Sequence, residues 1–206
     1  LQNIDHSLFN LINQGMSNTL FDLIMPIFHK PNLISIIFLL AICIIIFNKN
    51  LNQKLLNKRL KNYKFSPIMI LSFIFLTIII TDQTGRAIKS LELRDRPWAN
   101  KTTEQVNCLT CKLDKTNPNL YLTNSKGANK SFPSNHAANS FAIAFVISFF
   151  FPKIKNKLYL LAFIISFSRI YIGVHYPFDI MYGMCLGLLA GYLVISIFNL
   201  YIKIKS

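Results

Sequence analysis

Charge is scarce in this sequence, and acidic charge is scarcer still. Only 15% of the 206 residues are charged, and 8 Asp or Glu stand against 22 Lys or Arg, for a formal net charge of +14. By contrast, 52% of the residues are hydrophobic and 18 are Phe. A soluble domain of this composition would expose large apolar patches that aggregate. The composition therefore excludes an ordinary soluble domain and predicts a membrane protein.

Cysteine is also rare, and four residues are too few for a disulfide framework. Cys43 and Cys185 lie in apolar runs and are interpreted as packing residues. Cys108 and Cys111 lie in a polar loop as Cys-Leu-Thr-Cys, where a structural disulfide and two free thiols are both open. The loop lacks a thioredoxin-like pattern and further zinc ligands, so neither a redox centre nor a metal site is expected.

The sequence has no basic stripe interleaved with surface aromatic residues, which argues against a nucleic-acid partner. The cations gather between apolar runs instead. Six lie in 48–64, and Lys153, Lys155 and Lys157 lie in a later short loop. By the positive-inside rule, these loops face the cytoplasm. No signal-peptide pattern is visible.

Five apolar runs approach the length of about 20 residues that a helix needs to cross the hydrocarbon core. They are 31–48, 65–81, 137–152, 157–176 and 180–202. We therefore expect an all-α fold: a polytopic membrane bundle of about five transmembrane helices in a single domain, 1–206.

Residues 1–30 carry apolar side chains at helical spacing. They are interpreted as an amphipathic helix or helical pair in the membrane interface, with an incomplete sixth span as the alternative. The connection 83–132 falls on the face opposite the Lys-rich loops, which in a bacterium is the periplasm. Its polar part, 98–132, is long enough for a functional lid. Its lysines fit contact with an acidic head group and simple solvation equally well.

Three polar blocks interrupt the apolar sequence, and the first contains Lys89 and Arg96. We expect 86–96 to form a short interfacial helix that ends before Pro97. Seven residues make two turns of such a helix, so both cations would face one anion. Pairing with the acidic residues between them is the alternative.

The second block is Pro133-Ser134-Asn135-His136, directly before the apolar run 137–152. Ser134 or Asn135 is suited to cap that helix. A helix start that offers free amides, a hydroxyl and an imidazole is also a natural phosphate cradle. A plain N-cap is the alternative for this block taken alone.

The third block is Ser168-Arg169, followed by His175 and Asp179. Pro177 begins a helix, so Asp179 falls in its first turn and accepts a hydrogen bond from the imidazole. That contact fixes the tautomer and leaves the second ring nitrogen free to attack. Arg169 is costly in a span unless it serves an anion or a carboxylate; a snorkelling arginine is the alternative.

In this order and spacing, the blocks resemble the signature of the type 2 phosphatidic acid phosphatase superfamily: Lys-x6-Arg-Pro, Pro-Ser-Gly-His and Ser-Arg-x5-His-x3-Asp. Ten of the eleven specified positions match, and the resemblance runs from about residue 65 to 200. The departure is Asn135, where the family has Gly. Asn keeps the backbone amide but adds a side chain that would crowd the pocket or touch a lipid head group.

The resemblance implies that His175 attacks phosphorus and forms a phosphohistidine, with Asp179 orienting it. It implies that His136 protonates the leaving oxygen and then activates water. It also implies the groups that hold the phosphoryl oxygens, so that neither metal nor cofactor is needed. These groups belong to Lys89, Arg96, Ser134, Asn135 and Arg169.

We therefore expect a metal-independent lipid phosphatase of the bacterial inner membrane, with the bilayer and a phosphorylated lipid as partners and its active site in the periplasm. The first candidate is a lipid A 1-phosphatase, and the alternatives hydrolyse undecaprenyl diphosphate or phosphatidylglycerophosphate. From other classes, a lipid phosphotransferase and a non-catalytic anionic-lipid binding protein remain open. Gly183, Gly187 and Gly191 form a small-residue row, for which packing inside a monomer is favoured over a homodimer.

Overall fold

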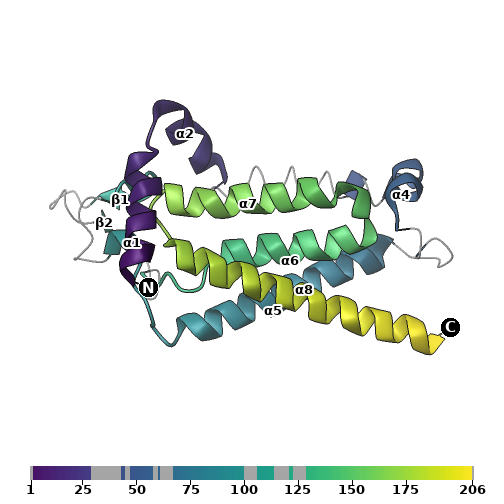
Figure 1. Cartoon of the computed structure of the whole chain (residues 1–206). Coiled ribbons are helices and arrows are strands. Elements are labelled where there is room, and N and C mark those ends of the chain that lie inside the picture. The colour runs from purple at the N-terminus through teal and green to yellow at the C-terminus, as the bar shows by residue number, and fades with distance from the viewer. Residues whose placement is uncertain are drawn as a thin grey trace.

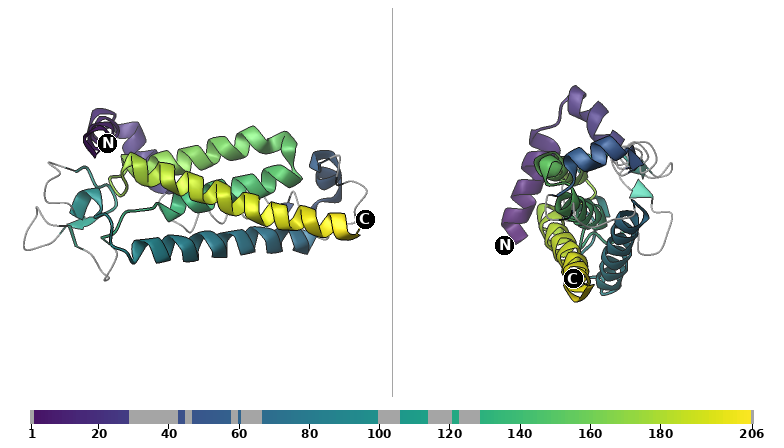
Figure 2. Two further views of the ribbon diagram at one scale, coloured as in Figure 1. Left: turned by 60° about the horizontal axis from the view of Figure 1, so that its bottom comes forward. Right: turned by 90° about the vertical axis from the view of Figure 1, so that its right-hand side faces the viewer.

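The computed structural model describes residues 2–28, 43–44, 47–57, 60, 67–99, 106–113, 121–122 and 129–205. Its main body consists of α5 (Pro67–Lys89), α6 (Asn135–Phe150), α7 (Lys155–Tyr171) and α8 (Pro177–Lys205). The four helices lie side by side, with α5 and α7 running opposite to α6 and α8 (Figure 1). Figure 2 shows the same bundle from a second side and along its length.

Helix α6 occupies the middle of the bundle and packs against α5, α7 and α8. Close packing with α8 depends on the glycine row of that helix. A Cβ at Gly183 would lie 2.5 Å from the carbonyl oxygen of Ser134, and one at Gly187 would overlap the backbone of Ala138. The small-residue row therefore serves packing inside the chain's own bundle, the use that the sequence favoured.

In the part of the chain that the structure describes, two helices are long and apolar enough to cross a membrane: Ile68–Lys89 of α5 and Pro177–Leu200 of α8. Four of the five expected runs correspond to α5, α6, α7 and α8. The second expected run stops at residue 81, whereas α5 continues to Lys89. The expected span 31–48 lies outside the described residues except for positions 43–44 and 47–48.

The N-terminal segment is helical but broken into short pieces. These are α1 (Gln2–Asn10), the π-helix η1 (Leu11–Gly15), α2 (Thr19–Ile24) and the 3-10 helix η2 (Met25–Phe28). Neither α1, with 9 residues, nor α2, with 6, is long enough to span a bilayer. The described part of the segment, residues 2–28, is therefore helical in short pieces.

The end of the bundle that holds the C-terminus carries α4 (Lys49–Leu55) and the 3-10 helix η5 (Pro152–Ile154) (Figure 1). The Lys153 ammonium donates to the Lys54 carbonyl at 2.8 Å. The two Lys-rich loops therefore meet at one end. The core beside them is rich in phenylalanine: the rings of Phe150 and Phe198 lie 5.5 Å apart and are almost fully buried.

The opposite end carries the long connection between α5 and α6. Its described elements are the 3-10 helix η4 (Pro97–Ala99) and the antiparallel pair β1 (Lys112–Leu113) and β2 (Tyr121–Leu122). Cys108 and Cys111 are joined in a disulfide. The sequence left a disulfide and two free thiols open, and the structure has the disulfide. Lys89, Ser134, Arg169 and Asp179 lie at the helix ends that face this connection.

Candidate active site

The first block is not the helix that the sequence predicted. Helix α5 ends at Lys89, and Glu92 has a left-handed backbone with φ of 53°, which a helix cannot include. Beyond that turn, the amide of Arg96 donates to the Asn129 carbonyl at 2.6 Å, and the amide of Ser131 donates to the Arg94 carbonyl at 2.9 Å. These bonds replace helical ones and fasten the first block beside the start of the second.

Lys89 and Arg96 nevertheless come together, from a helix end and an extended segment. Each interacts electrostatically with the other and with Asp179. The acidic residues between them turn elsewhere: Glu92 and Asp95 pair with Lys130 at 3.3 and 2.9 Å. Glu92 and Asp95 thus pair outside the stretch 86–96, which differs from the alternative that the sequence left open.

Ser134 caps α6, as predicted: its Oγ accepts a hydrogen bond from the amide of Ala137 at 3.4 Å. The serine is fully buried. Its own amide donates to the Asp179 carbonyl at 3.0 Å. The cap thus also joins the start of α6 to the start of α8.

Asn135 points its side chain toward α5. Its Nδ2 donates to Asp82 Oδ1 at 3.4 Å, and Asn139 Nδ2 donates to the same oxygen at 2.9 Å. Gly85 leaves room for it, because a Cβ there would lie 2.9 Å from the Asn135 Cγ. The added side chain is thus taken up by α5, whereas the sequence predicted contact with the pocket or the head group.

Arg169 is buried near the end of α7, with 2% of its surface exposed, so it does not snorkel to the surface. Its carbonyl accepts hydrogen bonds from the amides of Val174 and His175, both at 3.2 Å. This tight turn requires glycine at position 173 for two reasons. Gly173 has a φ of 79°, which favours glycine, and a Cβ there would lie 2.8 Å from the Asn107 carbonyl oxygen. The turn places His175 back over the end of α7.

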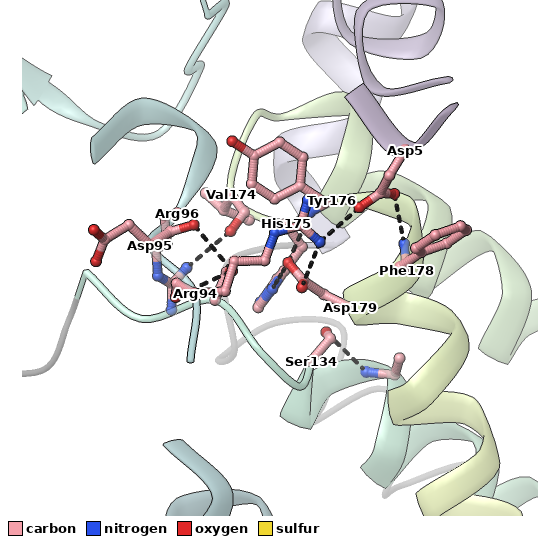
Figure 3. Close-up of polar contacts among 12 residues, drawn as sticks. Asp5, Arg94, Asp95, Arg96, Ser134, Val174, His175, Tyr176, Phe178 and Asp179 are labelled. Carbon is pink, nitrogen blue, oxygen red and sulfur yellow. Dashed lines mark hydrogen bonds and ion pairs between the residues drawn. The ribbon is translucent and has the colours of Figure 1, made fainter. Parts of the chain in front are cut away.

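His175 and Asp179 face one another across the first turn of α8 (Figure 3). His175 Nδ1 lies 3.5 Å from Asp179 Oδ2, and the exposed fractions of the two residues are 1% and 0%. The same Oδ2 accepts the amide of Tyr176 at 2.9 Å. Nδ1 has no hydrogen-bond partner among the described residues, so the hydrogen bond to Asp179 that the sequence predicted is not formed, although the two groups lie within 3.5 Å of each other.

The surroundings of His175 disfavour a second proton. Burial lowers the pKa of His175 well below its usual range, and the charges of Arg96, Arg169 and Lys89 lower it further. The imidazole is therefore neutral near pH 7, which is the form that can act as a nucleophile.

Arg96 contacts the turn between α7 and α8 and also has a side-chain nitrogen that is available as a hydrogen-bond donor. Its Nη1 donates to the Val174 carbonyl at 3.4 Å. Its Nε is buried and has no hydrogen-bond partner among the described residues. His136, in the first turn of α6, is exposed, in contrast to His175. The site thus combines a buried imidazole with an accessible one.

Two residues that the sequence did not single out complete the arrangement. Arg94 Nη1 lies 2.6 Å from Asp5 Oδ2 and 3.3 Å from Asp179 Oδ1. Asp5 belongs to α1 and is 1% exposed. Arg94 stands inside the first block and was available as a signal, whereas nothing in the sequence connects Asp5 to residues about 90 and 175 positions away.

Within the described part of the chain, no group of three or more His, Cys, Asp or Glu side chains is placed to hold a metal ion. The chemistry available to these residues is that of an anion held by Lys89, Arg96 and Arg169 beside an oriented imidazole. Such cations stabilise the charge of a transferring phosphoryl group.

The chain is similar in sequence and in structure to known proteins. The chain is 29% identical over 126 residues to the bacitracin transport permease protein BcrC of Bacillus licheniformis, covering 61% of this chain and 54% of that protein. It is 38% identical over 77 residues to the lipid A 4'-phosphatase of Bacteroides thetaiotaomicron, covering 36% and 34%. The matched parts therefore span about half or less of these two relatives.

Among solved structures, Aquifex aeolicus LpxE superposes with a TM-score of 0.65 and 27% identity, covering 92% of this chain and 93% of that one. The sequence profile of the PAP2 superfamily matches residues 67–203, which include all three blocks. This match extends over more than half of the chain and confirms the family that the motif spacing indicated. The chain belongs to the PAP2 superfamily.

Proposed function

We propose that this protein is a membrane lipid phosphatase that hydrolyses a phosphate or diphosphate head group through a phosphohistidine at His175. One observation carries the proposal: a buried imidazole faces Asp179 on one side and interacts with three cations, Lys89, Arg96 and Arg169. A histidine kept for packing needs neither the orienting carboxylate nor the cations, whereas a nucleophile toward phosphate uses both.

In the proposed first step, His175 Nε2 forms a bond to phosphorus while the bond from phosphorus to the leaving oxygen breaks. His136 gives its proton to that oxygen. In the second step, His136 takes a proton from water, whose oxygen attacks phosphorus and releases Nε2. His136 is exposed, which suits a group that must meet both the leaving alcohol and water.

The phosphoryl oxygens would be held by cations, by the Ser134 hydroxyl and by the backbone amide of Asn135 at the start of α6. The cations are Lys89, Arg96 and Arg169. Charge stabilisation of this kind replaces the role that a metal ion plays in other phosphoryl-transfer sites. We therefore propose activity without a metal ion or cofactor, and inhibition by vanadate.

For the membrane arrangement, we propose five spans: the run 31–48 and helices α5, α6, α7 and α8. The whole chain, 1–206, would be one domain, with 1–30 in the membrane interface. The Lys-rich end would face the cytoplasm. The motif-bearing connection 83–132 and the active site would then face the periplasm of the bacterial inner membrane. The proposal is supported by the position of the Lys-rich loops at one bundle end and the three blocks at the other.

For the substrate, we propose lipid A, with the 1-phosphate as the first candidate. Similarity to LpxE over nearly the whole of both chains and to a lipid A 4'-phosphatase supports this choice. The 4'-phosphatase matches only 34% of its own length, so this similarity does not displace the 1-phosphate as the first candidate. Similarity to an undecaprenyl-diphosphatase and to phosphatidylglycerophosphatase B, both of Bacillus subtilis, keeps those two substrates as alternatives.

The test is phosphate release by the detergent-purified protein from lipid A, undecaprenyl diphosphate and phosphatidylglycerophosphate. His175→Ala is the inactive variant and His29→Ala the matched control, because His29 lies outside the three blocks. We expect release from lipid A that His175→Ala abolishes and His29→Ala preserves. Mass analysis of the lipid product identifies which phosphate is lost.

Equal turnover of the three lipids would contradict the lipid A assignment and leave a phosphatase of broad specificity. Transfer of the phosphate to a lipid or sugar acceptor, without incorporation of oxygen from labelled water, would replace hydrolysis with phosphotransfer. Lipid binding with no turnover by any route, unchanged by His175→Ala, would instead support a non-catalytic binding protein.

A further inference from the structure

Arg94 bridges two buried carboxylates next to the candidate nucleophile (Figure 3). Its Nη1 lies 2.6 Å from Asp5 and 3.3 Å from Asp179, and its guanidinium carbon lies 3.7 Å from the centre of the Tyr176 ring. The Arg94 side chain is 21% exposed, whereas the two carboxylate side chains are 1% and 0% exposed. A planar guanidinium that both pairs and stacks is held in one orientation.

Asp5 reaches this cluster from α1, at the other end of the sequence. Its Oδ1 accepts the amide of Phe178 at 2.9 Å, which is a free amide of the first turn of α8. Its Oδ2 faces Arg94. A buried carboxylate is stable only when its charge is matched in this way. Asp5 therefore caps the helix that carries Asp179 and also anchors Arg94.

Tyr176 shows how closely α1 surrounds the nucleophile. The His6 ring stacks on Tyr176 with centroids 4.9 Å apart, and the Phe9 ring lies 5.2 Å away. The Tyr176 amide in turn donates to Asp179 Oδ2. Asp179 thus has Arg94 at one oxygen and the Tyr176 amide at the other, and α1 contacts both of these partners.

We propose that Asp5 and Arg94 are positioning residues that hold Asp179 against His175, and that α1 is therefore part of the active site. The inference rests on the proposed function of His175 as the nucleophile. Two carboxylates and one guanidinium leave a net charge of −1 behind the imidazole. That charge stabilises the positive charge that the ring gains when Nε2 bonds to phosphorus while Nδ1 keeps its proton.

The experiment compares Arg94→Gln, Arg94→Lys and Asp5→Asn with two matched controls. Asp22→Asn removes another carboxylate of the N-terminal segment, one that accepts from the Tyr171 hydroxyl at 2.6 Å. Arg86→Gln removes an exposed cation that lies 4.0 Å from the half-buried carboxylate of Asp82. Asp22→Asn changes the net charge as Asp5→Asn does, and Arg86→Gln changes it as Arg94→Gln does. Both controls leave the contacts of Asp179 in place.

We expect Arg94→Gln to lower kcat about 100-fold with little change in KM, because misplaced catalytic groups cost this much while phosphate binding is intact. Arg94→Lys should restore about a tenth of the activity, since it keeps the charge but not the planar fork. Asp5→Asn keeps the oxygen that caps α8 and should lower kcat about 10-fold. In the double variant, the two losses should not add.

A second readout does not depend on turnover. Nitrogen NMR of the ¹⁵N-histidine-labelled protein reports the tautomer of each imidazole. We expect His175 to hold its proton on Nδ1 in the wild type and in both controls, and to lose this preference in Arg94→Gln. An unchanged tautomer, an unchanged kcat, or an equal loss in Asp22→Asn would overturn the positioning role.

These outcomes separate the two proposals. Phosphate release that survives His175→Ala would overturn the proposed function, and the tautomer measurement would still decide whether Arg94 and Asp5 order the imidazole. A wild type that needs His175 but not Arg94 would keep the phosphatase and remove α1 from its active site.

Discussion

The two ends of the bundle are built from the same four helices but bury different chemistry. The site end encloses polar and charged side chains: Asp5, Ser131, Ser134, Ser168, Arg169, His175 and Asp179. The end near α4 encloses apolar ones, among them Ile70, Phe150, Phe151 and Phe198. Close apolar packing stabilises a fold, whereas buried charges add little net stability and are kept where they do chemistry. Activity and stability should therefore respond to substitutions at different ends.

The largest effect is expected for His175→Ala at the site end. Removal of a nucleophile from a catalytic constellation lowers kcat about 10⁴-fold or more. His175 is fully buried, but its side chain is smaller than that of Phe150, so the midpoint of thermal unfolding in detergent should fall less than it does in Phe150→Ala. Phosphate release and the unfolding midpoint are measured on the same preparation. A folded variant with near wild-type kcat would contradict the difference between the ends.

The reverse pattern is expected for Phe150→Ala. Phe150 is fully buried and its ring contacts those of Phe73, Phe149 and Phe198. The cavity should lower the free energy of unfolding by about 3 kcal/mol. The folded fraction should keep a kcat within a few-fold of the wild type, because the site is at the other end. Denaturant titration gives the first quantity, and kcat per folded molecule gives the second.

The glycine row of α8 sharpens the comparison because it runs from the site along α6 as far as Phe145. A Cβ at Gly183 would lie 2.5 Å from the Ser134 carbonyl, at the site, whereas one at Gly191 would lie 2.9 Å from the Phe145 side chain. A carbonyl cannot move without shifting α6, but a side chain can turn aside. Gly183→Ala should therefore lower kcat about 10-fold, and Gly191→Ala should leave kcat unchanged. Similar losses in both would mean that helix spacing acts on the whole bundle.

The pH dependence of kcat/KM should reflect the burial of His175. The pKa of His175 is lowered by burial and by the neighbouring cations, so the neutral imidazole persists as the pH falls below the ordinary histidine value. The acidic decline of kcat/KM that belongs to His175 should therefore lie below about pH 6.5. A pH profile of kcat/KM from pH 4 to 9 measures this. An acidic limb at or above 6.5 would mean that the imidazole is not shielded as the structure shows.

The smallest effect is expected from removal of metal ions. EDTA should leave phosphate release unchanged, because Lys89, Arg96 and Arg169 supply the positive charge. Vanadate, which resembles the phosphoryl group in the transition state, should inhibit phosphate release. Loss of activity in EDTA, restored by a divalent cation, would rule out the metal-independent mechanism.

Much of this arrangement was predictable from the sequence, for a local physical reason. The apolar runs after residue 65 predicted α5 to α8 because a helix that crosses lipid must satisfy its own backbone. A cap by Ser134 or Asn135 and the proximity of His175 to Asp179 were also predictable, since both depend on neighbours within one helical turn, but the hydrogen bond predicted between His175 and Asp179 is not formed. For Arg169 the sequence left a snorkelling side chain open, and the structure buries it.

The parts that could not be predicted are contacts between distant segments. The extended path from Glu92 to Arg96 depends on hydrogen bonds to residues 129 and 131, and helix-compatible composition pointed the other way. The side chain of Asn135 has a place because Gly85 faces it on another helix. The position of Asp5 next to the site depends on its contacts with Arg94 and Phe178. Local patterns carry no information on such pairs.

The measurement that tests the central claim most directly is chemical trapping of the phosphorylated protein. The protein is mixed with lipid substrate that carries ³²P, quenched within milliseconds and digested, and the labelled peptide is sequenced. We predict a label on His175 that is stable in base and lost in acid, as phosphohistidine is. The label should be absent in His175→Ala, and in His136→Ala both its formation and its loss should be slower, because that residue acts in both proposed steps. A label on another residue, or rapid turnover with no label at any time, would contradict the account.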